Sequence, residues 1–115
     1  MKSLLFVCLL VACAKKQEAP KEQTVPAMSA AEIQRSSDAC KAYVDKVCAC
    51  AATVPAVQDE CNLSKALPEA VRIGVEVSQS AESKPKDIYG AQDSVRKAVK
   101  TCIEKMAQLP SRGCP

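Results

Sequence analysis

The chain has 115 residues, a formal net charge of +3 and 25% charged residues, which allows one small domain and excludes two large ones. Aromatic residues make up only 3% and no residue is Trp, so few side chains can stack on nucleic-acid bases or fill a core. No residue is His, which removes the usual general base at neutral pH and the commonest metal ligand. Composition therefore argues against a nucleic-acid partner and against enzyme activity.

Residues 1–12 have the layout of a secretory signal peptide. Lys2 supplies a positive charge, and the apolar run behind it is too short to span a bilayer. The run ends in Leu10-Val11-Ala12-Cys13, which resembles the lipobox of bacterial lipoproteins. The resemblance implies that the signal is cut before Cys13 and that this cysteine becomes the lipid-modified N-terminus, carrying diacylglyceryl and N-acyl groups. It covers the sorting signal alone and implies no activity for the rest of the chain.

Ordinary secretion is the alternative interpretation of this segment. Ala12 and Ala14 flank Cys13 in the small-x-small pattern of a secretory cleavage site. A cut at that site would release a soluble protein that begins at Lys15.

Residues 13–29 form the lipidated N-terminus and a linker in the preferred interpretation. They are polar and lack apolar periodicity, which predicts a flexible tether. In lipoproteins of Gram-negative bacteria, a residue other than Asp after the lipidated cysteine sends the protein to the outer membrane. By this resemblance Ala14 implies the outer membrane, with the domain facing the periplasm.

Residues 30–115 are expected to form a cysteine-rich helical domain. Ser29 and Glu32 match a capping box, so a first helix is predicted to begin there and to end near Ala52. Tyr43 lies at the edge of the apolar face of this helix and is expected to be half-buried with its hydroxyl in water. The buried face itself is expected to contain Ile33, Cys40, Val44 and Val47.

A second helix is predicted from Pro55 to about Ser83, because proline suits a first helical turn. Pro68 lies inside this pattern and predicts a kink or break near Leu67. Gly74 lies in the middle of the apolar face and indicates a close approach of two helices. The acidic pair Asp59-Glu60 is expected to favour the positive N-terminal turn of the same helix.

A third helix is predicted to run to Leu109, with Asp87 as a possible cap and Gly113 free to take a positive φ in the tail. Its basic residues are opposite in sign to the acidic residues of the second helix, so weak attraction across the bundle is expected. The residues concerned are Glu69, Glu76 and Glu82 on one helix and Arg96, Lys97 and Lys100 on the other.

Six of the eight cysteines remain once Cys8 leaves with the signal and Cys13 is lipidated or removed. An even number in an exported chain predicts three disulfides. We expect Cys40 to bond Cys102 through the core. Cys48 and Cys50 point apart on a helix, so they should reach different partners. Those partners are Cys61 and Cys114, in an order that the sequence leaves open.

The predicted fold is all-α: a small disulfide-stapled three-helix bundle with up-down-up topology. The predicted function is that of a non-enzymatic lipoprotein anchored in the outer membrane through Cys13, acting as an envelope interaction or accessory module with a possible envelope protein partner. No cofactor and no small-molecule substrate is expected.

Two other functions stay open at this point. One is a secreted soluble effector, inhibitor or carrier. The other is a soft-metal binder that uses Cys48 and Cys50 with Cys61 or Cys114 as thiolates. The oxidising compartment and the lack of His argue against the metal site.

Overall fold

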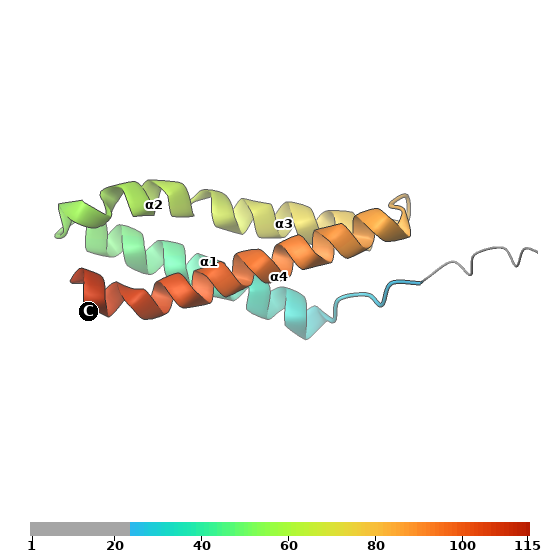
Figure 1. Ribbon diagram of the computed structural model, residues 1–115, viewed down its shortest axis with the longest axis horizontal. Coiled ribbons are helices and arrows are strands. Elements are labelled where there is room, and N and C mark those ends of the chain that lie inside the picture. The colour runs from blue at the N-terminus through green and yellow to red at the C-terminus, as the bar shows by residue number, and fades with distance from the viewer. Residues whose placement is uncertain (1–23) are drawn as a thin grey trace, which may run out of the picture.

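The computed structural model describes residues 24–115 as an elongated bundle of helices (Figure 1). The elements in chain order are α1 (Ala30–Ala51), a 3₁₀ turn η1 (Pro55–Val57), α2 (Gln58–Ser64), α3 (Ala66–Gln79), α4 (Pro85–Gln108) and a 3₁₀ turn η2 (Leu109–Arg112). Because α2 and α3 follow one another in one rod, the bundle has three rods, which confirms the predicted all-α, disulfide-stapled three-helix fold. The predicted signal peptide and Cys13 lie outside the described residues.

The start of α1 follows only half of the predicted capping box. The Ser29 hydroxyl accepts a hydrogen bond from the Glu32 backbone N–H at 3.1 Å. The Glu32 carboxylate does not return to Ser29, because it accepts a hydrogen bond from Arg96 Nε of α4 at 2.8 Å. The same residue that was expected to cap α1 therefore joins α1 to α4.

The second rod breaks at Lys65, two residues before the predicted kink at Leu67. The break places Pro68 in the first turn of α3, where a missing N–H loses no hydrogen bond within the helix. The rod also ends at Gln79, short of the predicted Ser83.

Two glycines have the roles that the sequence predicted for them. A Cβ added to Gly74 would lie 2.5 Å from Val95 Cγ2 of α4, so the absence of a side chain allows the close packing that was predicted. Gly113 takes the positive φ of 87° that was expected of the tail. The start of α4 differs, since Pro85 occupies its first turn and Asp87 lies inside the helix.

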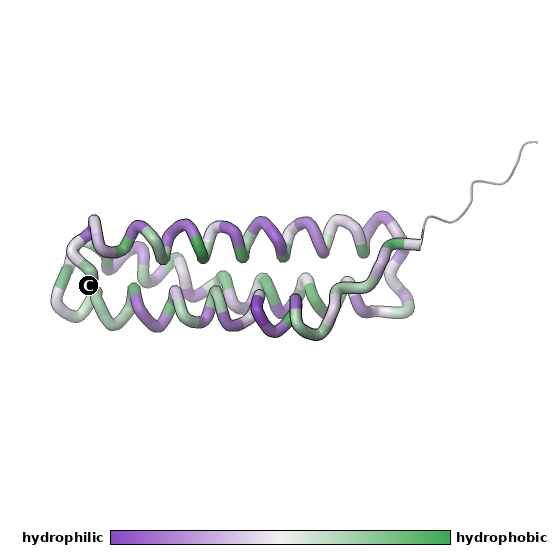
Figure 2. Tube along the Cα trace, turned by 90° about the horizontal axis from the view of Figure 1, so that it is seen from below, coloured by the Kyte–Doolittle hydropathy of each residue, from purple (hydrophilic) through white to green (hydrophobic). Residues whose placement is uncertain are grey.

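The core is narrow and contains many half-cystines. Hydrophobic residues recur along one side of the helices in Figure 2. The largest fully buried side chains are those of Tyr43, Leu109, Val47, Val57, Val95, Cys40, Cys102 and Cys114. Ile33 and Val44, predicted to be core residues, are only partly buried. A core with so few large side chains gains little from transfer out of water, so covalent links are important for its stability.

The acidic residues named on the second rod form no ion pair with the basic residues named on α4 in the part of the chain that the structure describes. Arg72 binds Glu69 and Glu76 of its own helix at 2.7 and 2.8 Å, and Lys97 binds Asp93 at 2.6 Å. Partners three or four residues away on a helix are already adjacent, so these pairs form at little cost in side-chain order. All are solvent-exposed and contribute little to stability.

Candidate functional site at the cross-linked end of the bundle

Three disulfides join the elements of the bundle. Cys40 of α1 bonds Cys102 of α4, the pair favoured from the sequence, and both residues are fully buried. Cys48 bonds Cys61 of α2, and Cys50 bonds Cys114 of the C-terminal tail. The structure thereby selects one of the two orders that the sequence left open. The last two disulfides lie where α1 ends and the tail returns, and we call this the cross-linked end.

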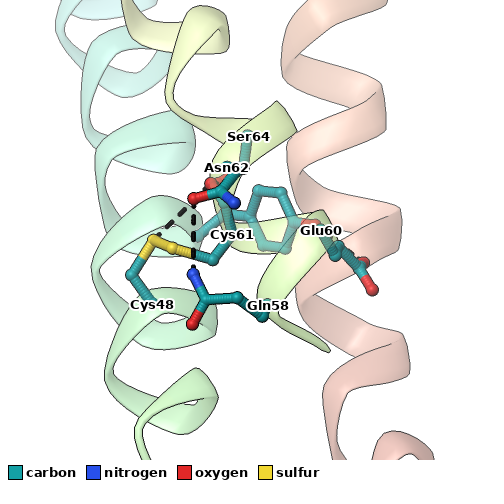
Figure 3. The surroundings of a disulfide bond; sticks show 7 residues. Cys48, Gln58, Glu60, Cys61, Asn62 and Ser64 are labelled. Carbon is teal, nitrogen blue, oxygen red and sulfur yellow. Dashed lines mark hydrogen bonds between the residues drawn. A yellow bond between two sulfur atoms is a disulfide. The ribbon is translucent and has the colours of Figure 1, made fainter. Parts of the chain in front are cut away.

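The Cys48–Cys61 disulfide holds the short helix α2 against α1 (Figure 3). The Ser64 hydroxyl donates a hydrogen bond to the Cys61 carbonyl oxygen at 2.7 Å, which helps to satisfy the end of this helix. Glu60, the residue before Cys61, extends from α2 toward α4 in the same view. One residue of α2 is thus bonded to α1 while its neighbour faces α4.

The Glu60 carboxylate is the centre of a polar cluster at this end. Tyr43 Oη donates a hydrogen bond to Glu60 Oε1 at 2.8 Å, and Arg112 Nη1 lies 3.0 Å from Glu60 Oε2. Lys105 Nζ lies 3.9 Å from Oε1. The Glu60 side chain is only 15% exposed, so these partners compensate a charge that is largely removed from water. The cluster connects α1, α2, α4 and η2 through one side chain.

Tyr43 is a buried hydrogen-bond donor in this cluster. It is 2% exposed, which corrects the prediction of a half-buried residue with a water-bound hydroxyl. Burial raises the pKa of Tyr43 above its ordinary value, and the hydrogen bond to the negative Glu60 raises this pKa further. The phenol therefore keeps its proton, and its hydrogen bond to the carboxylate, to a higher pH than an exposed tyrosine does.

A shallow hollow of about 200 Å³ lies beside this cluster, between the second rod and α4. Leu63, Leu67 and Thr101 line it together with Tyr43, Glu60, Ser64 and Lys105. Leu63 is 78% exposed at its rim. The polar side chains of the hollow already have partners: Tyr43 and Lys105 bind Glu60, and the Ser64 and Thr101 hydroxyls donate to backbone carbonyl oxygens. The surface that the hollow presents is therefore small and mainly apolar.

Sequence reasoning identified the six cysteines and missed the polar cluster. Asp59-Glu60 was expected to act on the helix N-terminus alone. Both residues do lie in the first turn of α2, but Glu60 also binds three other elements. One signal was present: Glu60 precedes a cysteine and Arg112 lies two residues before another, so two disulfides restrict where both side chains can lie.

The described residues also bear on the alternative of a metal site. Cys48, Cys50, Cys61 and Cys114 are all bonded to sulfur in the structure, so none is a thiolate in this form. Within residues 24–115, no group of three or more Cys, His, Asp or Glu residues is arranged to hold a metal ion. Over the same range, no helix combines the length and the apolar character needed to cross a bilayer.

Comparison with protein-family models, with curated proteins and with solved structures found no match to this chain.

Proposed function

We propose that this protein is a small non-enzymatic lipoprotein, anchored in the outer membrane through Cys13 and acting in the envelope as an interaction or accessory module. The observation that carries the proposal is the set of three disulfides. Disulfides of this kind form and persist in oxidising compartments such as the periplasm, which is the destination that the lipobox-like signal implies. Two separate parts of the chain, the signal and the cysteines, thus favour the same compartment.

The polar cluster supports a binding or scaffolding role over catalysis. Glu60 is held by Tyr43, Lys105 and Arg112, so its carboxylate is engaged by partners within the protein. A general base must be within reach of a substrate proton, and a carboxylate that is 15% exposed and already paired with Tyr43 and Arg112 is poorly placed for that role. Exposed apolar side chains such as Leu63 and Ile103 offer a surface to an envelope protein partner.

The test is to express the full chain in a Gram-negative host and measure the mass of the mature N-terminal peptide. The expected peptide begins at Cys13 and carries the mass of a diacylglyceryl and an acyl group. The Cys13→Ser variant is expected to lose both the lipid mass and the recovery in the membrane fraction. A mature chain that begins at Lys15 would instead establish the secreted alternative and overturn the proposal.

Two further measurements on the same material complete the test. Ala14→Asp is expected to retain the lipidated protein in the inner membrane, while the native chain reaches the outer membrane. A thiol count after acid trapping is expected to find the six cysteines of the domain blocked. Free thiols that bind a soft metal at these positions would favour the metal-binding alternative.

A further inference from the structure

The chain enters the bundle at the end opposite the disulfides. Residues 24–29 are not helical, yet they pack on the bundle near the turn between α3 and α4 (Figure 1). Gln92 Nε2 donates a hydrogen bond to the Pro26 carbonyl oxygen at 2.8 Å, and Met28 is 6% exposed. The Met28 sulfur lies 3.9 Å from Ser78 Oγ of α3. These residues were assigned to the linker, and contacts from α3 and α4 fasten them to the bundle.

We call this end, formed by residues 24–29 and the α3–α4 turn, the turn end. A hollow of about 380 Å³ opens there, lined by Val25, Pro85, Lys86 and Tyr89. Tyr89 is 66% exposed. A tyrosine has an apolar ring and a polar hydroxyl, which is the combination that concentrates at the boundary between lipid and water.

The number of residues between Cys13 and the turn end limits how the bundle can stand on a membrane. The eleven peptide steps from Cys13 to Thr24 span at most about 40 Å when fully extended. A flexible chain of that length spans about 17 to 20 Å on average. The 24 residues of α4 make the bundle about 36 Å long. Turning the cross-linked end to the bilayer would therefore need the linker at nearly its full extension.

We propose that the turn end is a membrane-contact surface, in which Val25, Lys86 and Tyr89 lie against phospholipid headgroups. The cross-linked end then projects away from the membrane and presents Leu63 and the Glu60 cluster to partners. This inference rests on the proposed lipid anchor and adds to it an orientation of the domain.

The charges at the turn end shape the expected contact. Lys84 and Lys86 are close in sequence to Glu82 and Asp87, so the net charge of this segment is zero. Electrostatic attraction to anionic lipid is thus weak, and the attachment point and Tyr89 determine the contact. The contact is expected to be equally strong on vesicles with and without anionic phospholipid.

The absence of Trp from the chain allows a direct test. Tyr89→Trp places one fluorophore at the turn end, and Leu63→Trp places one near the cross-linked end. Both positions are exposed, at 66% and 78%, so neither substitution disturbs the core. Each mature lipidated variant is reconstituted in phosphatidylcholine vesicles, with and without phosphatidylglycerol, that contain a lipid with a nitroxide on its headgroup. Nitroxide quenches tryptophan only at short range.

The expected result is loss of most of the emission of Trp at position 89 and little loss at position 63. Equal quenching at both positions, quenching at position 63 alone, or quenching at neither position would overturn the inference. The Cys13→Ser form of the Tyr89→Trp variant is expected to show no quenching. If that unanchored form is quenched as strongly as the lipidated one, the turn end binds phospholipid by itself, and the part of the inference that assigns the orientation to the anchor is wrong.

The failure of the anchor and the failure of the orientation can be told apart. Mass analysis of the same samples shows whether the lipid is present. If natural processing does not lipidate Cys13, residues 13–115 can be produced behind an unrelated cleavable signal so that Cys13 is retained. Its thiol can then be coupled to a maleimide phospholipid, because the six cysteines of the domain bond one another. The quenching comparison is then repeated on the coupled protein, and its outcome decides the orientation whatever the fate of the proposed function.

Discussion

Removing the Cys40–Cys102 disulfide is expected to take away a large part of the stability of the domain. The two residues are 62 positions apart, so the disulfide closes a long loop between α1 and α4. The chain-entropy relation gives about 4 kcal/mol at 25 °C for a loop of this length. Both residues are fully buried, so alanine at these positions also leaves a small cavity. A small domain has about 5 to 15 kcal/mol in total.

The matched control removes the Cys48–Cys61 disulfide, whose residues are only 13 positions apart. The same relation gives about 3 kcal/mol for this shorter loop. The assay is urea unfolding of Cys40→Ala/Cys102→Ala and of Cys48→Ala/Cys61→Ala, followed by far-ultraviolet circular dichroism. The first variant is expected to lose about 1 kcal/mol more than the second, or to be unfolded without urea. Equal losses, or a larger loss in the second variant, would refute the reasoning from loop length and burial.

Four further outcomes follow from the structure. Full reduction and alkylation of the purified domain is expected to abolish the helical circular-dichroism signal, because the disulfides supply stability that a core with few large side chains lacks. A retained melting transition would contradict this expectation. Glu60→Gln is expected to lower the free energy of unfolding by about 1.5 kcal/mol and the exposed Glu104→Gln by less than about 0.5, as measured by urea unfolding. Gly74→Ala is expected to lower the free energy of unfolding by about 1 to 3 kcal/mol, because the added Cβ meets α4. Gly90 has open space around it, so Gly90→Ala is expected to raise the free energy of unfolding by about 0.5 to 1 kcal/mol. Similar effects at both sites would argue against close packing at Gly74. The pKa of Tyr43 is higher in the folded protein than in the unfolded chain, so the unfolded chain loses this proton first and the free energy of unfolding is expected to fall as pH rises above about 10. Unfolding curves measured between about pH 9 and 11 are expected to show that Tyr43→Phe lacks this part of the pH dependence.

Local signals in the sequence were sufficient for the helices and for their approximate ends. Ser29 caps α1, Pro55 begins the element after the first turn, and Gly113 takes the one backbone conformation that favours glycine. These outcomes depend on a few neighbouring residues, so the chain around each position decides them. The start of α4 was predicted less well, because Asp87 was the expected cap and the helix begins at Pro85. The break in the second rod was placed two residues late, because the first turn of a new helix accepts Pro68 as readily as a kink would.

The candidate site, too, was predictable from the sequence only in part. An exported chain with six cysteines predicts three disulfides, and the spacing of Cys48 and Cys50 on a helix separates their partners by about 160°. Spacing cannot say which partner lies on which side, since that depends on how the second rod and the tail pass around α1. The hydrogen bond of Tyr43 to Glu60 depends on the same choice.

The helical class of the domain, the approximate positions of its turns and the number of its disulfides follow from the sequence, because short-range backbone preferences and cysteine chemistry fix them. The packing of the rods sets three further features: Cys61 bonds Cys48, Glu60 binds Tyr43 and Arg112, and residues 24–29 dock on α3 and α4. Each of these contacts joins segments distant in the sequence, and the side on which one rod packs against another has no signature in the spacing of residues along either.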